Sequence, residues 1–142
     1  MRIADVLRNK GAAVVTINPD ATVRELLAGL AERNIGAMVV VGADGVVGIV
    51  SERDVVRQLH THGASVLTRP VSKIMTATIA SCAKGDTIDE VSALMTRNRV
   101  RHVPVLEGRN LIGIVSIGDV VKTRMEELEA EQQQLHSYIT QG

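Results

Sequence analysis

The stretch GIVSERDVV at residues 48–56 recurs as GIVSIGDVV at residues 113–121, an offset of 65 positions. Seven of the nine positions are identical, and the same offset carries Thr22 onto Thr87 without a gap. A segment that returns at a constant spacing indicates an internal structural repeat. The sequence therefore predicts two copies of one small folding unit.

Each copy follows the order β–α–β–β–α. In the first copy an extended run at 14–17 leads through the turn signal at 18–20 to apolar residues at helical spacing from Val23. An apolar run at 37–41, a turn at Asp44-Gly45 and a second run at 46–50 predict a β-hairpin. A helix is expected after Ser51.

The second copy repeats this order with other side chains. Strands are expected at 79–82, 103–106 and 111–115, and helices from residue 88 and after Ser116. Thr22 and Asp86 are the predicted N-caps of the first helix in each copy, because hydroxyl and carboxylate oxygens accept from free N–H groups.

A copy of about 50 residues cannot bury its own sheet. We therefore expect an α+β fold in which the two pseudo-symmetric repeats pack sheet against sheet, with a C-terminal helix extension. The predicted boundaries are 1–62 for the first repeat, 63–73 for a linker punctuated by Gly63 and Arg69-Pro70, 74–124 for the second repeat, and 125–142 for a helical tail.

Composition restricts the function. The chain has 142 residues, 45% of them hydrophobic, and sixteen basic side chains balance sixteen acidic ones. A neutral chain lacks the field that drives binding to nucleic acid or membrane surfaces, and Tyr138 is the only aromatic residue available for base stacking. The single cysteine excludes an intrachain disulfide. With no signal-peptide pattern and no long apolar run, a cytoplasmic protein without nucleic-acid or membrane partners is expected.

The repeated Ser-x-x-Asp has two interpretations. In the first it is a capping box, in which Ser51 and Asp54, and likewise Ser116 and Asp119, satisfy free backbone groups at a helix N-terminus. In the second the same groups bind a ligand: the helix N-terminus attracts phosphate, and an Asp carboxylate accepts both hydrogen bonds of a ribose diol. The sequence leaves both open.

The paired repeats, their Gly-Ile-Val-Ser-x-x-Asp endings and the segment RHVPV at 101–105 resemble a pair of cystathionine-β-synthase (CBS) domains, a Bateman module. The resemblance covers about residues 2–124. It implies a regulatory module that binds AMP, ADP, ATP, NAD or S-adenosylmethionine in one or two clefts between the repeats. It also implies a homodimer and a separate regulated protein, whose identity the sequence does not give.

The resemblance assigns residues to each cleft. Asp54 would hold the ribose in the first, which would use Ser51, Arg53, Asp54, Gly36, Ala37, Met38, Thr76, Thr78, Ile79 and Ala80. The second would use Ser116, Asp119, Lys10, Gly11, Ala13, Val14, Arg101, His102, Val103 and Pro104.

The copies differ most in their basic residues. Arg53 stands where the second copy has Gly118, and Arg101 and His102 stand where the first has Gly36 and Ala37. These cations are expected to contact phosphates, so the clefts are expected to differ in ligand or affinity. The alternative for the basic run at 97–101 is a solvated helix end.

Three other features have structural interpretations. His60 and His62 lack a third ligand at metal spacing and are expected at an exposed helix end. Cys82 is expected to be a buried small side chain. Near-heptad apolar residues in a helix from about residue 117 to 138 favour a dimer contact, with an intramolecular cover as the alternative.

The repeat also argues against catalysis. Only Ser and Asp recur as polar groups, and no histidine recurs at the offset. An enzyme needs a nucleophile, a base and a group that orients them. The prediction is a binding module that is not an enzyme and has no catalytic residues, metal or catalytic cofactor. A protein-interaction module with empty clefts and a nucleotide-processing enzyme are the alternatives.

Overall fold

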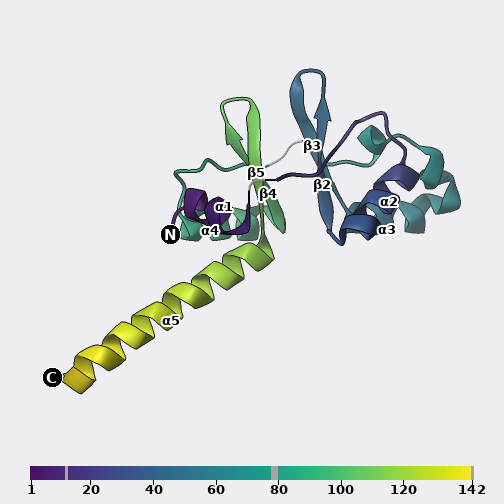
Figure 1. Ribbon diagram of the computed structural model, residues 1–142. Coiled ribbons are helices and arrows are strands. Elements are labelled where there is room, and N and C mark those ends of the chain that lie inside the picture. Colours follow the sequence, from purple (N-terminus) through teal and green to yellow (C-terminus); the bar gives the residue numbers. More distant parts are fainter. Residues whose placement is uncertain (12, 78–79, 142) are drawn as a thin grey trace. The chain divides into compact units, whose positions relative to one another are not determined.

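The computed structural model describes residues 1–11, 13–77 and 80–141. The chain divides into two compact units. Unit 1 consists of Met1–Ala12, Ala80–Leu106 and Gly113–Gly142, and unit 2 of Ala13–Ile79 and Glu107–Ile112. The α+β class is confirmed, and the first copy has the predicted β–α–β–β–α order, whereas the second has the order α–β–β–α with a single bridge at Cys82 in place of its opening strand (Figure 1).

Unit 2 contains a three-stranded sheet with the order β1-β2-β3. The first two strands are parallel and the last two antiparallel, with Met38 opposite Val50. The predicted hairpin forms, but Ala43 and Asp44 make its loop, and Gly45, with φ of 109°, begins β3. The elements are β1 (Thr16–Ile17), α2 (Val23–Arg33), β2 (Ala37–Gly42), β3 (Gly45–Ser51) and α3 (Glu52–His62).

Unit 1 contains the corresponding elements of the second copy, apart from the hairpin tip Glu107–Ile112, which belongs to unit 2. The β4–β5 hairpin is joined at Cys82, which bridges Val105 in parallel and takes the place that β1 has in the first copy. Of the predicted strand at 79–82, Ile79 lies outside the described residues. The elements are α4 (Ile88–Asn98), β4 (His102–Glu107), β5 (Asn110–Ser116) and α5 (Ile117–Gln141).

An N-terminal helix, α1 (Ile3–Lys10), was not predicted from the sequence. It belongs to unit 1, where its Ile3 and Ala4 amides donate to the carbonyls of Asp86 and Lys84, each at 2.9 Å. Its apolar side chains are buried, with Ile3 fully so. The first residues of the chain therefore complete the unit that holds the second repeat.

The helix caps are equivalent in the two copies. Thr22 accepts from the Glu25 amide at the start of α2, as predicted, and Thr87 accepts from the Glu90 amide at the start of α4. The prediction that Asp86 caps α4 is wrong. Its carboxylate instead accepts from the Ala83 amide at 2.9 Å, which closes a turn before the helix.

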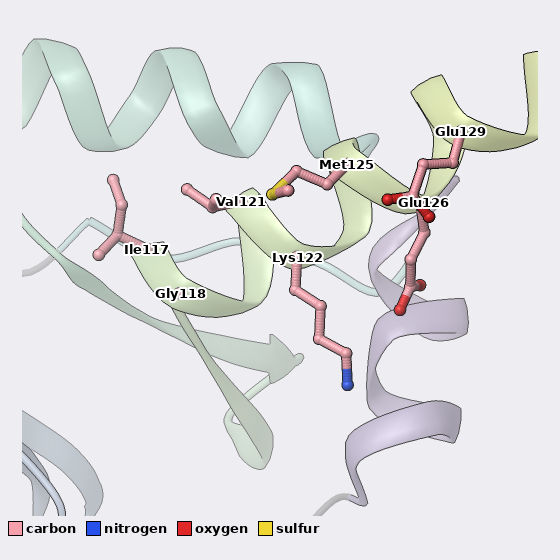
Figure 2. Close-up of a pocket in the computed structure, with 7 residues that line it drawn as sticks. All are labelled: Ile117, Gly118, Val121, Lys122, Met125, Glu126 and Glu129. Carbon is pink, nitrogen blue, oxygen red and sulfur yellow. The ribbon is translucent and has the colours of Figure 1, made fainter. Parts of the chain in front are cut away.

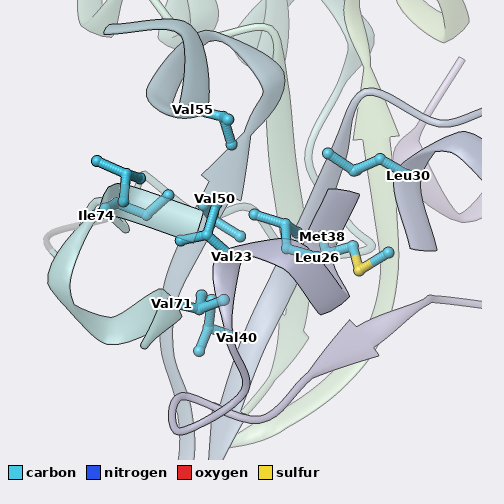
Figure 3. Packing of buried hydrophobic residues seen from close by; sticks show 10 residues of the cluster. Val23, Leu26, Leu30, Met38, Val40, Val50, Val55, Val71 and Ile74 are labelled. Carbon is cyan, nitrogen blue, oxygen red and sulfur yellow. The ribbon is translucent and has the colours of Figure 1, made fainter. Parts of the chain in front are cut away.

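The hydrophobic core of unit 2 lies between the sheet and its helices (Figure 3). Residues 63–73, expected to be a linker, form two 3-10 helices, η1 (Gly63–Thr68) and η2 (Val71–Lys73). Val66 and Val71 are fully buried, so this segment is part of the core. The cluster contains Val23, Leu26, Leu30, Met38, Val40, Val50, Val55, Val66, Val71 and Ile74.

The C-terminal extension is one continuous helix, as predicted. Val120 and Thr123 are buried near the start of α5, whereas every residue from Leu128 to Gln141 is exposed. Figure 1 shows the yellow half of α5 projecting from the rest of unit 1. Within the described residues, no helix has the length and apolar character needed to cross a bilayer.

Candidate functional site

Each copy places a Ser–Asp pair where a strand passes into a helix. At the start of α3, Asp54 Oδ2 accepts from the Ser51 amide at 2.9 Å and from Ser51 Oγ at 3.2 Å. At the start of α5, Asp119 Oδ2 accepts from the Ser116 amide at 2.8 Å and from Ser116 Oγ at 3.0 Å. Each Ser Oγ also accepts from the Asp amide three residues on. The capping-box geometry is therefore formed in both copies.

A carbonyl from the neighbouring strand holds the first helical residue at each junction. The Gly36 carbonyl accepts from the Glu52 amide at 3.0 Å, and the Arg101 carbonyl accepts from the Ile117 amide at 2.8 Å. These are equivalent contacts at the 65-residue offset. The backbone preceding β2 or β4 is thus fixed beside the Ser–Asp pair of its own copy.

The two junctions differ in their nearest cation. Lys10, at the end of α1, places Nζ 2.6 Å from Asp119 Oδ2 and 2.9 Å from the Ile114 carbonyl oxygen. The position equivalent to Lys10 in the second repeat is Met75, which has no charge to offer Asp54. The junction in unit 1 therefore contains an ion pair that has no counterpart at Asp54 among the described residues of unit 2.

The environment of Asp119 lowers the pKa of its carboxyl group below the ordinary value of 3.8. Burial favours the neutral form and acts to raise this pKa, but hydrogen bonds from Lys10 and Ser116 and the Lys10 charge together outweigh it. Asp119 is therefore held as a carboxylate already paired with an ammonium group.

The carbonyl that accepts from Lys10 in unit 1 belongs to Ile114, and the equivalent carbonyl in unit 2 has a backbone partner. Ile49, the equivalent of Ile114, exchanges two backbone hydrogen bonds with Thr76, at 3.0 and 2.9 Å. A side chain on Gly48 would collide with this segment, because a Cβ there would lie 2.7 Å from the Thr76 carbonyl oxygen. The structure thus places Thr76, one of the residues assigned to the first cleft, beside Ile49 of β3. Ile49 lies two residues before Ser51 in the same strand.

Several residues assigned to the clefts are buried strand positions. Ala37 pairs with Ser51 in the β2–β3 register, whereas Met38 packs in the hydrophobic core of unit 2. Val103 and Pro104 are likewise buried in β4. Of these residues, Ala37 lies directly beside Ser51, and the roles of Met38, Val103 and Pro104 at a ligand stay predictions.

The other residues that were assigned to the clefts belong to one unit or the other, or lie outside the described residues. Thr78 and Ile79 lie outside the described residues. Gly11 lies in unit 1 after α1, with φ of 93°. Each cleft was expected to draw on both repeats, and Ala80 belongs to unit 1 while Ala13 and Val14 belong to unit 2. Their roles stay predictions.

The basic residues near the junctions lie at the surface. Arg53 and Arg101 are exposed, and His102 is half-buried. Arg99 ends α4 in the left-handed conformation with φ of 54°, as Asn34 ends α2 with φ of 52°. Arg99 therefore has a structural role as a helix C-cap, and the phosphate contacts expected of Arg53 and Arg101 stay predictions.

The other sequence features have structural places. His60 and His62 are exposed at the end of α3, as expected. Cys82 is buried, and this burial raises the pKa of its thiol to about 12. In the part of the chain that the structure describes, no group of three or more His, Cys, Asp or Glu side chains is placed to hold a metal ion.

These observations define a class of protein. It consists of two repeats built from the same α+β unit, and each repeat has a Ser–Asp pair where a strand passes into a helix. The chain belongs to the CBS domain family, whose sequence model matches residues 3–61 and 71–126. The resemblance stated from the sequence is thereby confirmed.

Relatives of the whole chain support this assignment. A mitochondrial CBS domain-containing protein of Arabidopsis thaliana is 34% identical over 99% of this chain and 72% of its own length. The crystal structure of a CBS-domain-containing protein from Agrobacterium tumefaciens is 45% identical, with a TM-score of 0.84 over 87% of this chain and 92% of that one. A CBS domain pair solved with 5′-methylthioadenosine and S-adenosyl-L-methionine has a TM-score of 0.80 at 21% identity, over 89% and 98% of the two chains, and shows the shared fold.

Proposed function

We propose that this protein is a regulatory sensor that binds adenosyl compounds at its two Ser–Asp junctions. The observation that carries the proposal is the pair of aspartates, Asp54 and Asp119, each oriented by its own capping box at a helix N-terminus. Among the described residues, the hydrogen bonds to both carboxylates fall on Oδ2. The second oxygen, Oδ1, is then available to accept from a ribose hydroxyl.

The ligand class is supported by chemistry and by family. A helix N-terminus favours an anion, and an exposed arginine beside it, Arg53 or Arg101, favours phosphate. The CBS pair solved with 5′-methylthioadenosine and S-adenosyl-L-methionine has the same fold and binds adenosyl ligands. AMP, ADP, ATP, NAD and S-adenosylmethionine all present the adenosine group that these junctions would bind.

The proposal includes a functional difference between the junctions. Asp54 has no cation in contact among the described residues, whereas Asp119 is paired with Lys10. A ribose diol that uses both carboxylate oxygens of Asp119 must compete with this ion pair on Oδ2. Asp54 is therefore the stronger of the two ribose positions.

The function proposed is binding and not catalysis, and its output goes to another protein. Occupancy of the junctions would change the surface that the module shows to a partner, provided that the ligand prefers one conformation. A homodimer belongs to the proposal, because α5 leaves large apolar side chains exposed. A module that only holds proteins together is the second candidate, since the capping boxes alone account for the Ser–Asp geometry.

The test is a thermal-shift titration of nucleotide-free protein with AMP, ADP, ATP, NAD and S-adenosylmethionine. A ligand at one hundred times its Kd should stabilise the fold by about 2.7 kcal/mol. Asp54→Asn and Asp119→Asn are the matched variants, because an amide keeps one oxygen for the capping box and removes the charge. A shift with one ligand that either variant abolishes supports the sensor. No shift with any ligand, checked by calorimetry, refutes it and favours the protein-interaction module.

A further inference from the structure

One side of α5 carries an unbroken series of exposed positions at heptad spacing. Val121, Met125 and Leu128 are 50–56% exposed, and Leu135 and Ile139 are 59% and 66% exposed. Figure 2 shows Ile117, Val121 and Met125 on one side of the helix, with Lys122 extending from another. The intervals alternate between four and three residues, as in the a and d positions of a coiled coil. We name this series the α5 seam: Val121, Met125, Leu128, Gln132, Leu135 and Ile139.

The distal half of α5, from Leu128 to Gln141, buries none of its described residues. The buried residues of this helix, Val120 and Thr123, lie in its first two turns, and the remainder projects from unit 1 (Figure 1). An isolated helical segment shorter than about 12 to 15 residues is marginal in water. The projecting segment is therefore expected to gain its stability by burying the seam against another surface.

Gln132 identifies that surface as a second copy of the helix in parallel orientation. It is the single polar residue of the seam, between Leu128 and Leu135. The spacing of the seam places Gln132 at an a position and its neighbours Leu128 and Leu135 at d positions. In a parallel, in-register pair, each a position faces the same a position, so the two Gln132 amides can hydrogen-bond to each other. In an antiparallel pair, a positions face d positions, and each amide would be buried against an apolar side chain at a cost of about 1–3 kcal/mol.

The flanking polar residues favour the same arrangement. In a parallel pair the g position of one helix approaches the next e position of the other. Arg124 then faces Glu129 of the second copy with the opposite charge, and Glu131 faces His136, whose ring N–H can donate a hydrogen bond to the carboxylate. An antiparallel pair that covers the whole seam would instead bring Glu129 against Glu129 and Glu131 against Glu131, which is repulsive. Arg124 already bonds Glu127 within its own chain at 3.1 Å, so Glu131 and His136 make the clearer pair.

We propose that two copies of this protein associate through residues 121–139 of α5 as a parallel, in-register, two-stranded coiled coil. This coiled coil rests on the homodimer in the proposed function, and it specifies which residues form the dimer interface and in which register. It does not depend on ligand binding, so the cross-linking below and the titration above can fail separately.

Three consecutive glutamines provide the test with its own controls. Gln132→Cys places a thiol in the seam, whereas Gln133→Cys and Gln134→Cys place it on the outer face of the same turn. Under mild oxidation of ligand-free, full-length protein, Gln132→Cys should form a covalent dimer at least tenfold faster than either control. The native Cys82 will not interfere, because it is buried and its pKa is raised to about 12. Equal rates in the three variants, or no dimer with Gln132→Cys, overturn the proposal.

A second measurement separates orientation and assembly from folding. Leu128→Cys and Leu135→Cys should each cross-link to the same residue of the second copy, which only a parallel register permits at both positions. Leu128→Glu with Leu135→Glu should raise the dimer dissociation constant at least tenfold in light scattering, while circular dichroism shows both units still folded. The matched variant Gln133→Glu should leave the dissociation constant unchanged. A dimer of unchanged strength in the double variant refutes the seam.

Discussion

Replacing Lys10 by Met tests whether the ion pair at Asp119 competes with a ligand. The substitution keeps a long apolar side chain at the end of α1 and matches Met75, the equivalent residue of the other copy. It removes the ammonium group that lies 2.6 Å from the Asp119 carboxylate. We expect Lys10→Met to strengthen the binding of AMP at this junction.

The magnitude follows from the exposure of the pair. The Lys10 and Asp119 side chains are 32% and 21% exposed, so the contact lies between a surface ion pair and a buried one. Surface pairs contribute up to about 1 kcal/mol, and a hydrogen bond to a charged group contributes about 1.5–3 kcal/mol. Taking about 1 kcal/mol as the cost of displacing Lys10, the affinity of this junction should rise about fivefold.

Calorimetric titration of AMP into the Asp54→Asn background isolates the Asp119 junction. The double variant Asp54→Asn with Lys10→Met should bind AMP with a Kd about fivefold lower than Asp54→Asn alone. An unchanged Kd would show that the ion pair does not compete with the ligand. A higher Kd would show that Lys10 binds the ligand directly, and either result refutes the reasoning.

The same variant has an acid-stability signature in the absence of ligand. Because the pKa of Asp119 in the folded protein lies below its ordinary value of 3.8, the ion pair stabilises the fold fully above that pH. This contribution is lost as the pH falls below 3.8 through the lower folded value. Urea unfolding should show a constant difference between wild type and Lys10→Met at neutral pH that shrinks on acidification. A difference that persists after Asp119 is protonated contradicts the assignment.

Two further predictions concern stability. Gly48→Ala should lower the free energy of unfolding by about 1–3 kcal/mol, because its Cβ would lie 2.7 Å from the Thr76 carbonyl oxygen, as measured by urea unfolding. Gly113→Ala is the matched control and should cost less, since its Cβ meets side-chain atoms of Leu7, which can rotate away, and not a backbone carbonyl; an equal cost would contradict this explanation. Arg99→Asn should stabilise the fold by about 0.5 kcal/mol, because Asn tolerates the left-handed conformation better. A loss of stability in differential scanning calorimetry would show that Arg99 makes a contact that matters more than its backbone conformation.

The repeat made most of the fold predictable. A constant offset transferred the helices and the hairpin from one copy to the other, although the opening strand of the second copy is reduced to a bridge at Cys82, and alternating and helical periodicity located the hairpins and α2. The prediction that Asp86 caps α4 was wrong because the neighbouring Thr87 caps the helix. The Asp86 carboxylate instead accepts from the Ala83 amide in the preceding turn. Helix α1 was missed because eight residues carry little intrinsic helical signal, and the burial of Ile3 against unit 1 is a tertiary effect.

The candidate site was predictable only in its local part. The Ser–Asp pairs are three residues apart, so a capping box could be recognised from the sequence. Lys10 and Asp119 are 109 residues apart, and no periodicity or composition relates them. The family resemblance assigned Lys10 and Asp119 to one cleft, but their ion pair became visible only when the fold brought the end of α1 beside the start of α5.

The continuity of α5 links the Asp119 junction mechanically to the far end of the chain. A helix of 25 residues is about 37 Å long at a rise of about 1.5 Å per residue. A tilt of about 10° at its first turn, where Ser116 and Asp119 lie, would move its last turn by about 6 Å. A lever of this length would amplify a small rearrangement around a bound nucleotide into a displacement large enough for a partner protein to detect.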